Sequence, residues 1–366
     1  MRPFRGGINL GLDRFSGLYL WGAFIIAFSI WEPNTFPTAS TVHSVASFQA
    51  INAIMGIAAL IPLAANQFDL SIGANAQLTG ITAAVIENNL HWNLLVAILF
   101  SIAIGALIGC TNAFIVIKFR VSSFIVTLGM GSVLGATQII VTGNQQPNPV
   151  LNPAWGNWTQ FHIAGFQVVV LYMLIIAVVA WWFLEHTPGG RYIYATGANA
   201  EAARLSGINV DRWSATTLIL SGTLAGFSGV LYTSLNGSSS LQFGSALLLP
   251  AFASAFLGST QIKPGRFNVW GMVLMIYVLA TGVQGLQLIN GAVWLSQMFN
   301  GVALILAVSL AATRQRQETS GKGHRRRIAK IGPAKGNEPL PPDLAGNGAR
   351  APVPAASGGP PEPSTG

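Results

Sequence analysis

Residues 93–120, NLLVAILFSIAIGALIGCTNAFIVIKFR, contain an apolar run that ends at two basic residues, Lys118 and Arg120. The run from Asn93 to Ile117 holds no Lys, Arg, Asp or Glu. An α-helix needs about 20 predominantly apolar residues to cross a bilayer, and loops rich in Lys and Arg stay in the cytoplasm. This stretch therefore predicts a transmembrane helix whose C-terminal end is cytoplasmic.

The same alternation of apolar runs and basic clusters extends through residue 312. Before residue 313, every Lys and Arg falls in one of four clusters: Arg2, Arg5 and Arg14; Lys118 and Arg120; Arg191, Arg204 and Arg212; Lys263 and Arg266. An even number of apolar stretches separates neighbouring clusters, and the connections at the opposite ends carry no Lys or Arg. A Lys or Arg at mid-bilayer costs about 2.5–3.5 kcal/mol on insertion scales. The pattern predicts an all-α, polytopic membrane protein with both termini in the cytoplasm.

The composition excludes a soluble protein. Charged residues make up 8% of the chain and hydrophobic residues 51%, whereas soluble domains carry about 25% charged residues. The net charge of +8 comes from the four clusters and from the tail after the last apolar run. Attraction to anionic lipid of the inner leaflet explains such juxtamembrane charge, so membrane lipid is an expected partner and nucleic acid is not.

We place ten transmembrane helices and three regions on the chain. The helices are expected near Phe15–Trp31, Phe48–Ala65, Ser71–Ile86, Asn93–Ile117, Ser123–Val141, Gln167–Leu184, Trp213–Tyr232, Ser245–Gly258, Phe267–Gly282 and Val293–Ala312. The third and eighth are short and rich in small or polar residues, so they are either full spans or broken, re-entrant segments. The regions are a cytoplasmic N-terminus (1–14), a transmembrane domain (15–312) and a basic, Pro- and Gly-rich cytoplasmic tail (313–366), expected to be disordered from Gln315.

Small residues recur at four-residue spacing in several of these helices. Ser101, Gly105 and Gly109 form one set, Gly131 and Gly135 a second, and Gly222 and Gly226 a third. Such spacing lets helices approach closely in lipid. We therefore predict close helix packing at all three sets.

Sequence signatures of enzymes are missing from the chain. It has no phosphate-binding loop, no zinc-protease motif and no nucleophile elbow, and its one cysteine, Cys110, forms no disulfide or Cys-based metal site. We expect no catalysis, cofactor or metal in this chain. Energy for transport would then come from an ion gradient or from a separate subunit that hydrolyses ATP.

A gradient-driven carrier normally buries ionisable residues along its ion path. Asp69, between the second and third helices, is the one candidate in the chain. The favoured interpretation is a structural N-cap, whose carboxylate accepts from free amides at a helix start and contributes about 1 kcal/mol. Proton coupling is the alternative.

Residues 196–209, TGANAEAARLSGIN, predict a short capped helix in a cytoplasmic loop, residues 185–212. Asn199 suits an N-cap, Glu201 the first turn, Arg204 the last turn and Gly207 a left-handed stop. A helix this short is not stable alone. It must dock on the protein's own helix ends or on a partner.

Three segments resemble the ribose-type permeases of bacterial ABC importers: Glu201–Ala203 with its loop, Asp69–Gly73 followed by Leu78–Gly80, and Gly190–Ala195. The resemblance extends from Phe36 to Val308. It implies two permease copies in the bacterial cytoplasmic membrane, a cytoplasmic ATP-binding subunit that holds ATP and magnesium, and a periplasmic or lipid-anchored sugar-binding protein. It also implies that the ATP-binding subunit receives the short helix through Asn199, Glu201, Ala202, Ala203, Arg204 and Gly207.

The chain departs from the family pattern at four places. Gln67 replaces a Gly, Ala198–Ala200 replaces Gly-Asn-Glu, Leu249–Ala251 replaces a segment with an Asp, and Gln261–Arg266 replaces a Gly-rich turn. The residues Glu201, Ala202, Ala203, Arg204 and Gly207 are retained, so coupling to an ATPase should survive. The change at Leu249–Ala251 lies in the transmembrane part and puts the identity of the substrate in doubt.

Neutral amides, rather than charges, occupy the membrane segments. They exchange hydrogen bonds with hydroxyl groups and create no strong electrostatic well, which suits a neutral polyol, although interhelical hydrogen bonding is the alternative role for each. The candidate path residues are Asn52, Asn75, Gln77, Asn112, Gln138 and Gln284, and the amide of Gln287 and the hydroxyl of Thr79 are further neutral polar groups in these segments. The uncharged outer loop Gly143–Phe166, with Trp155 and Trp158, either meets the binding protein or anchors at the interface.

The sequence thus predicts a homodimeric permease subunit that imports a monosaccharide or related neutral polyol, driven by a separate ATPase. Two alternatives stay open. One is a branched-chain amino-acid permease of the same architecture, and the other is a secondary transporter driven by an ion gradient.

Overall fold

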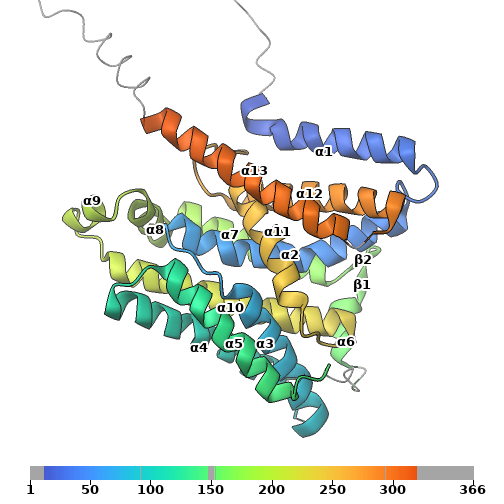
Figure 1. The fold of residues 1–366 in the computed structure, drawn as a ribbon, viewed down its shortest axis with the longest axis horizontal. Helices are drawn as coiled ribbons and strands as arrows, with labels where there is room; N and C mark the ends of the chain where they lie inside the picture. The colour runs from blue at the N-terminus through green and yellow to red at the C-terminus, as the bar shows by residue number, and fades with distance from the viewer. Residues whose placement is uncertain (1–11, 91, 147–151, 153, 293, 320–366) are drawn as a thin grey trace, which may run out of the picture. The chain divides into compact units, whose positions relative to one another are not determined.

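The computed structural model describes residues 12–90, 92–146, 152, 154–292 and 294–319, which fold into a helical bundle with one small hairpin (Figure 1). The two strands, β1 (His162–Ile163) and β2 (Phe166–Gln167), pair antiparallel. The helices are α1 (Leu12–Trp31), α2 (Ala39–Ala64), α3 (Ile72–Val85), the π-helical turn Ile86–Leu90, α4 (Leu94–Phe119), α5 (Ser123–Thr142), α6 (Ala154–Gln160), α7 (Val169–His186), α8 (Pro188–Ala198), α9 (Ala200–Leu205), α10 (Val210–Asn236), α11 (Phe243–Gly258), α12 (Val269–Asn290) and α13 (Trp294–Thr319).

A helix lies at each position where an apolar run predicted one. Among the described residues, six helices are long and apolar enough to cross a membrane: α2, α4, α5, α7, α10 and α12. Shorter apolar stretches occur in α1, α11 and α13, at Phe15–Trp31, Phe243–Gly258 and Trp294–Ser309. The all-α membrane fold is therefore confirmed, while ten crossings and cytoplasmic termini stay predictions.

The two segments expected to be short are short. α3 has 14 residues and continues into the π-helical turn Ile86–Leu90, and α11 has 16 residues with Pro250 inside it. At 1.5 Å per residue, a helix like α3 spans about 21 Å, which is less than the roughly 30 Å hydrocarbon core. α3 alone is therefore too short to cross.

Helices α2 and α10 form the centre of the bundle. In each, 67% of the most apolar window is buried by the rest of the chain, against 17% in α5. α10 packs along α4, α3 and α2. Its contact with α4 requires glycine: a Cβ added at Gly105 would lie 2.8 Å from the carbonyl oxygen of Gly222. The close packing predicted for Gly105 and Gly222 is confirmed.

The prediction of close packing is wrong for Gly131 and Gly135 within this chain. No atom lies within 4 Å of a Cβ added at Gly135, and at Gly131 the nearest is the Leu70 carbonyl oxygen at 4.0 Å. The reason is the position of α5 at the edge of the bundle, where its main helix contacts are with α3 and α4. The glycine face of α5 is open.

The connection between α5 and α7 packs on the bundle. Trp155 of α6 is 1% exposed and packs with Ala83 and Val230, and its carbonyl oxygen accepts a hydrogen bond from Ser234 Oγ at 2.5 Å. Burying a large indole contributes more than leaving it at the surface. The interpretation of Trp155 as an interfacial anchor or a contact for a binding protein is therefore wrong.

The C-terminal helix extends further than the sequence suggested. α13 ends at Thr319, so residues 315–319, expected to be disordered, are helical. Alanine, arginine, glutamine and glutamate, which fill residues 311–318 apart from Thr313, are good helix formers. The remainder of the predicted tail, 320–366, and residues 1–11 of the predicted N-terminal segment lie outside the described residues.

Candidate functional site

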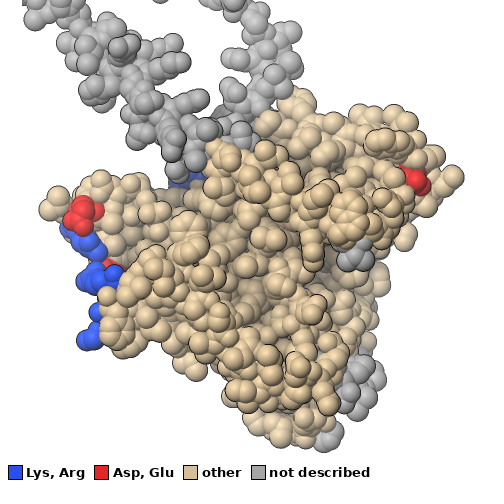
Figure 2. Space-filling model, viewed as in Figure 1, with Lys and Arg blue, Asp and Glu red and all other residues tan. Residues whose placement is uncertain are grey.

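Charged side chains are concentrated at one end of the molecule. In the view of Figure 2, most of the visible Lys and Arg side chains lie with Asp and Glu side chains at the end that carries α8 and α9. The rest of the visible surface is almost entirely uncharged. Large apolar side chains are exposed along α4, α5 and α7, as at Leu107, Ile125 and Val179. This surface is what a lipid-facing bundle with one polar end requires.

The short helix α9 has the local structure that the sequence predicts. Asn199 is its N-cap, and its Oδ1 accepts from the Ala202 amide at 3.0 Å. Gly207 has a φ of +80°, the left-handed conformation that glycine adopts most easily. Ala203 is buried, whereas Glu201, Ala202 and Arg204 are exposed. The helix therefore presents a polar face away from the bundle.

Leu205, which the sequence analysis did not single out, is the last residue of α9 and is 90% exposed. Single exposed leucines are common on protein surfaces, so exposure alone assigns no role. Its position differs from that of the lipid-facing leucines, because it lies at the charged end beside Arg204. The signal available in the sequence was an apolar residue inside a polar capped helix.

The preceding helix α8 attaches α9 to the bundle. A Cβ at Gly197 would lie 2.2 Å from the carbonyl oxygen of Ala64, so α8 meets the end of α2 at a glycine. The Tyr194 hydroxyl donates to the carbonyl oxygen of Phe267 at 2.7 Å. The Arg266 guanidinium lies 3.6 Å from the centre of the Tyr194 ring. Burial raises the pKa of Tyr194, and the Arg266 charge acts in the opposite direction.

The segment Gln261–Arg266, one of the departures from the family pattern, makes specific contacts. Gln261 is buried, and its Oε1 accepts from the Gly17 amide of α1 at 2.8 Å. Lys263 forms an ion pair with Glu185 at the end of α7. Arg266 stacks on α8 as described. The replaced turn therefore joins α1, α7 and α8 to the start of α12.

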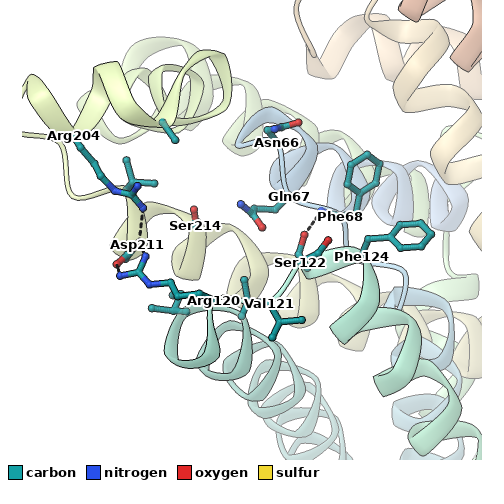
Figure 3. A pocket seen from close by; sticks show the side chains of 15 residues that line it. Asn66, Gln67, Phe68, Arg120, Val121, Ser122, Phe124, Arg204, Asp211 and Ser214 are labelled. Carbon is teal, nitrogen blue, oxygen red and sulfur yellow. Dashed lines mark hydrogen bonds and ion pairs between the residues drawn. The ribbon is translucent and has the colours of Figure 1, made fainter. Parts of the chain in front are cut away.

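A hollow of about 560 Å³ opens beside α9. Figure 3 shows Arg204, Asp211 and Arg120 along one side of it and Gln67 pointing toward Ser214. The Asp211 carboxylate accepts from Arg204 and Arg120 at once. Gln67, another departure from the family pattern, places an amide where glycine is usual. The hollow thus borders α9, the α4–α5 turn and the segment that leads to α3.

Asp69 is not the N-cap of α3. That position belongs to Ser71, because the chain turns once more before the helix begins. The carboxylate is 1% exposed, and its Oδ1 accepts from the amide and the hydroxyl of Ser71 at 3.1 and 2.6 Å. Ser71 Oγ in turn accepts from Asn112 Nδ2 of α4 at 2.9 Å. Asp69 still organises the start of α3, through an Asx turn that connects to α4.

A second hollow, of about 570 Å³, lies between α3, α5 and the start of α11, and we call it the polar groove. Gln77 and Gln138 line it and bind each other, Nε2 of Gln77 donating to Oε1 of Gln138 at 2.6 Å. Both are also bound to backbone: Gln138 Nε2 donates to the Ala74 carbonyl oxygen, and Gln77 Oε1 accepts from the Gly244 amide. Asn144, Gln242 and Ser245 also line the groove. None of its lining residues is charged.

The other candidate path residues lie elsewhere. Asn75 is buried between α4 and α10 and donates to the carbonyl oxygens of Gly105 and Gly222. Asn52 donates to Gln49 on its own helix, and Asn112 belongs to the Asp69 cluster. Gln284 lies on α12, away from the polar groove. Thr79 donates to the Gly226 carbonyl oxygen and Gln287 to Ser296. The structure therefore brings together two of the six, Gln77 and Gln138.

Comparison with known proteins gives one family. The family profile described as "Branched-chain amino acid transport system / permease component" matches residues 41–308. The chain is 32% identical over 290 residues to the ribose import permease protein of Escherichia coli (strain K12), which covers 78% of this chain and 90% of that protein.

Two further relatives also carry sugar names. The fructose import permease protein of Rhizobium meliloti is 26% identical over 78% of this chain and 81% of its own length. The D-allose transport system permease protein of E. coli (strain K12) is 24% identical over 84% of this chain and 94% of its own length. No solved structure matches the chain.

Proposed function

We propose, from the premise that the chain belongs to the family of binding-protein-dependent transport permease components, that it forms the membrane path of an importer for a monosaccharide or a related neutral polyol. It is a permease subunit of the sugar ABC importer type and not an enzyme. The observation that carries this conclusion is the 32% identity to a ribose import permease over 90% of that protein's length. The six apolar helices long enough to cross a membrane agree with it.

The substrate is assigned from the polar groove as well as from the relatives. The family profile's description mentions branched-chain amino acids, but these are zwitterions, and a site for them would need charged partners. The lining of the polar groove offers amides, two serines and backbone groups without a charge. Groups of this kind match the hydroxyls of a sugar. A neutral polyol therefore fits this groove better than an amino acid does.

A separate ATP-binding subunit, which holds ATP and magnesium, would supply the energy through α9. Support comes from the preformed, capped helix and its exposed Glu201 and Leu205 at the charged end. Asn199, Ala202, Ala203, Arg204 and Gly207 shape that helix. Leu205 is the apolar group that a cleft on the ATP-binding subunit would bury. Alternating access would follow from rigid-body displacement of α9 and the helices attached to it.

A second copy of the chain would complete the path. The polar groove is open along α5, the least buried of the six long helices, and the open glycines of α5 permit close approach of another helix. A periplasmic or lipid-anchored binding protein would deliver the sugar from the other side. The basic clusters support a cytoplasmic position for α9. The membrane would be the inner membrane of a bacterium.

The first experiment is affinity purification of the tagged protein from native membranes in mild detergent. We expect an ATP-binding subunit and a substrate-binding protein to copurify. The binding protein should bind ribose, fructose or allose in solution and not leucine. Uptake into proteoliposomes should require ATP inside and persist with an uncoupler. Uptake that does not depend on ATP and is abolished by the uncoupler would contradict the proposal and would favour a gradient-driven carrier.

The contact through α9 is tested in the same purification. Leu205→Asp should insert normally but lose the ATP-binding subunit, because a charge replaces the apolar group at the contact. Leu205→Met is the matched control, since methionine keeps an apolar side chain of similar volume. Equal recovery of the subunit with both variants would remove Leu205 from the interface.

A further inference from the structure

The carboxylate of Asp211 connects the end of α4 to helix α9. Arg120 ends α4, and its Nη1 and Nη2 lie 2.9 Å from Oδ1 and Oδ2 of Asp211. Arg204 belongs to α9, and its Nη2 lies 3.2 Å from Oδ1. Figure 3 shows the three side chains converging at the edge of the hollow. One acceptor in the first turn of α10 thus holds one arginine from each neighbouring element.

Helix α9 has few other attachments. It packs on α8 and on α10, and its second charged contact, between Arg204 Nη1 and Glu201 Oε1 at 2.9 Å, stays within α9. Within the described part of the chain, the ion pair between Arg204 and Asp211 connects α9 to the carboxylate that also binds Arg120. Exposed ion pairs contribute little to stability, so stability does not account for this arrangement. However, two parallel hydrogen bonds from a guanidinium to a carboxylate fix the direction and the distance between the two groups.

The Arg120 side of the bridge leads directly into α5. Arg120 has a φ of +55°, the left-handed conformation, which is uncommon for residues other than glycine. It begins the turn of residues 120–122 that joins α4 to α5. A displacement of the Arg120 guanidinium would therefore act on this turn and on the first residues of α5.

The start of α5 is in turn bound to the segment before α3. Ser123 Oγ accepts from the Phe68 amide at 2.9 Å, and Thr127 Oγ1 accepts from the Leu70 amide at 3.0 Å. Further along, Gln138 of α5 binds Gln77 of α3 across the polar groove. Movement at the beginning of α5 is thus connected to both walls of the groove.

We propose that Asp211 is a positioning residue that transmits displacement of α9, through Arg204 and Arg120, to the start of α5 and so to the polar groove. The proposal rests on the proposed function, because it assumes that a partner subunit displaces α9. Asp211 touches neither the substrate nor the partner in this role. The 560 Å³ hollow beside the bridge leaves room for the three side chains to move together.

The test measures sugar transported per ATP hydrolysed, in proteoliposomes containing the complete complex. Asp211→Asn and Arg120→Gln should each lower this ratio by about twofold to thirtyfold, the range found for substitutions between coupled sites. Asp211→Glu keeps a carboxylate, so its ratio of sugar transported to ATP hydrolysed should be closer to that of the wild type than the ratio of Asp211→Asn. Arg212→Ala is the matched control: it removes an exposed neighbouring cation outside the bridge, and its ratio should equal that of the wild type.

The double variant Asp211→Asn/Arg120→Gln separates a shared pathway from general damage. If the two residues act through one bridge, the double variant should be no worse than the more impaired single variant. Additive losses, or a normal ratio in both single variants, would overturn the inference. Arg120 is largely exposed, so Arg120→Gln carries the test even if substitution of Asp211 impairs folding.

The wild-type measurement distinguishes this inference from the proposed function. ATP-driven uptake by the wild type with an unchanged ratio in the variants would overturn the role of Asp211 alone. Uptake by the wild type that does not depend on ATP would overturn the proposed function and this inference together. ATP-driven uptake with uncoupled hydrolysis in the bridge variants would support both.

Discussion

At the scale of single residues, the polar side chains in the membrane segments serve mainly to hold helices together. Asn75 bridges α4 and α10, and Gln77 and Gln138 bridge α3 and α5. A buried amide without a partner is costly, and these three amides bind backbone groups or one another. The sequence identified these residue types correctly but not their partners, because partners come from segments far apart in the chain.

Asp69 gives a prediction at this scale. Asp69→Asn keeps an Oδ1 acceptor for the amide and hydroxyl of Ser71, and it replaces the unpartnered Oδ2 with a group that can donate to nearby Ser221. We therefore expect normal folding and ATP-driven uptake. Asp69→Ala removes the acceptor and should destabilise the protein by about 1–3 kcal/mol, seen as a lower thermal midpoint in detergent.

The two Asp69 variants also separate structure from proton coupling. A structural carboxylate predicts that Asn substitutes well and Ala poorly. If Asp69→Asn were as stable as the wild type but lost uptake or altered its dependence on pH, the carboxylate would have a role in transport, and the ion-coupled alternative would gain support.

At the scale of elements, the sequence predicted the features that depend on interactions between residues close together in the chain. The Asn199 cap and the Gly207 stop predicted α9, and the apolar runs predicted the long helices to within a few residues at most ends. α2 is an exception, beginning at Ala39 after the Thr38 cap rather than near Phe48. The burial of Trp155 and the bridge at Asp211 were not predictable, because both depend on how α10 packs against other helices.

Helix α5 gives a prediction at the scale of elements. Gly135→Leu places a bulky side chain where no atom of this chain lies within 4 Å, and leucine favours a helix more than glycine by roughly 1 kcal/mol. The monomer should therefore fold at least as well. If a second copy packs on this face, the variant should shift the protein from dimer to monomer in mild detergent, measured by light scattering.

The control for α5 uses its other face. Val133→Leu enlarges a side chain that is already 59% exposed and lies about 200° around the helix from Gly135. Its dimer fraction should equal that of the wild type. A Gly135→Leu protein that remains dimeric, with intact uptake, would place the second copy on another surface.

At the scale of the whole molecule, the sequence predicts the membrane class, the family and the position of the charged end. These depend on sums over many residues, and single errors in helix ends do not change them. The position of the polar groove depends instead on which helices become neighbours. For that reason four of the six candidate path residues, Asn52, Asn75, Asn112 and Gln284, lie outside the groove, whereas Asn144 and Gln242 went unnoticed.

The orientation of the whole chain is the prediction that the basic clusters make most directly. Cys110 is the only cysteine, so Cys110→Ala gives a background without thiols. In that background, and with the permease expressed without an ATP-binding subunit so that Leu205 stays exposed, Leu205→Cys should react with a membrane-impermeant maleimide only in inside-out vesicles, because the loop with Arg191, Arg204 and Arg212 is cytoplasmic. Phe161→Cys, 64% exposed in a connection without Lys or Arg, should react only in spheroplasts. Labelling of Leu205→Cys from outside would invert the topology, place α9 beyond the reach of a cytoplasmic ATPase and require another source of energy for transport.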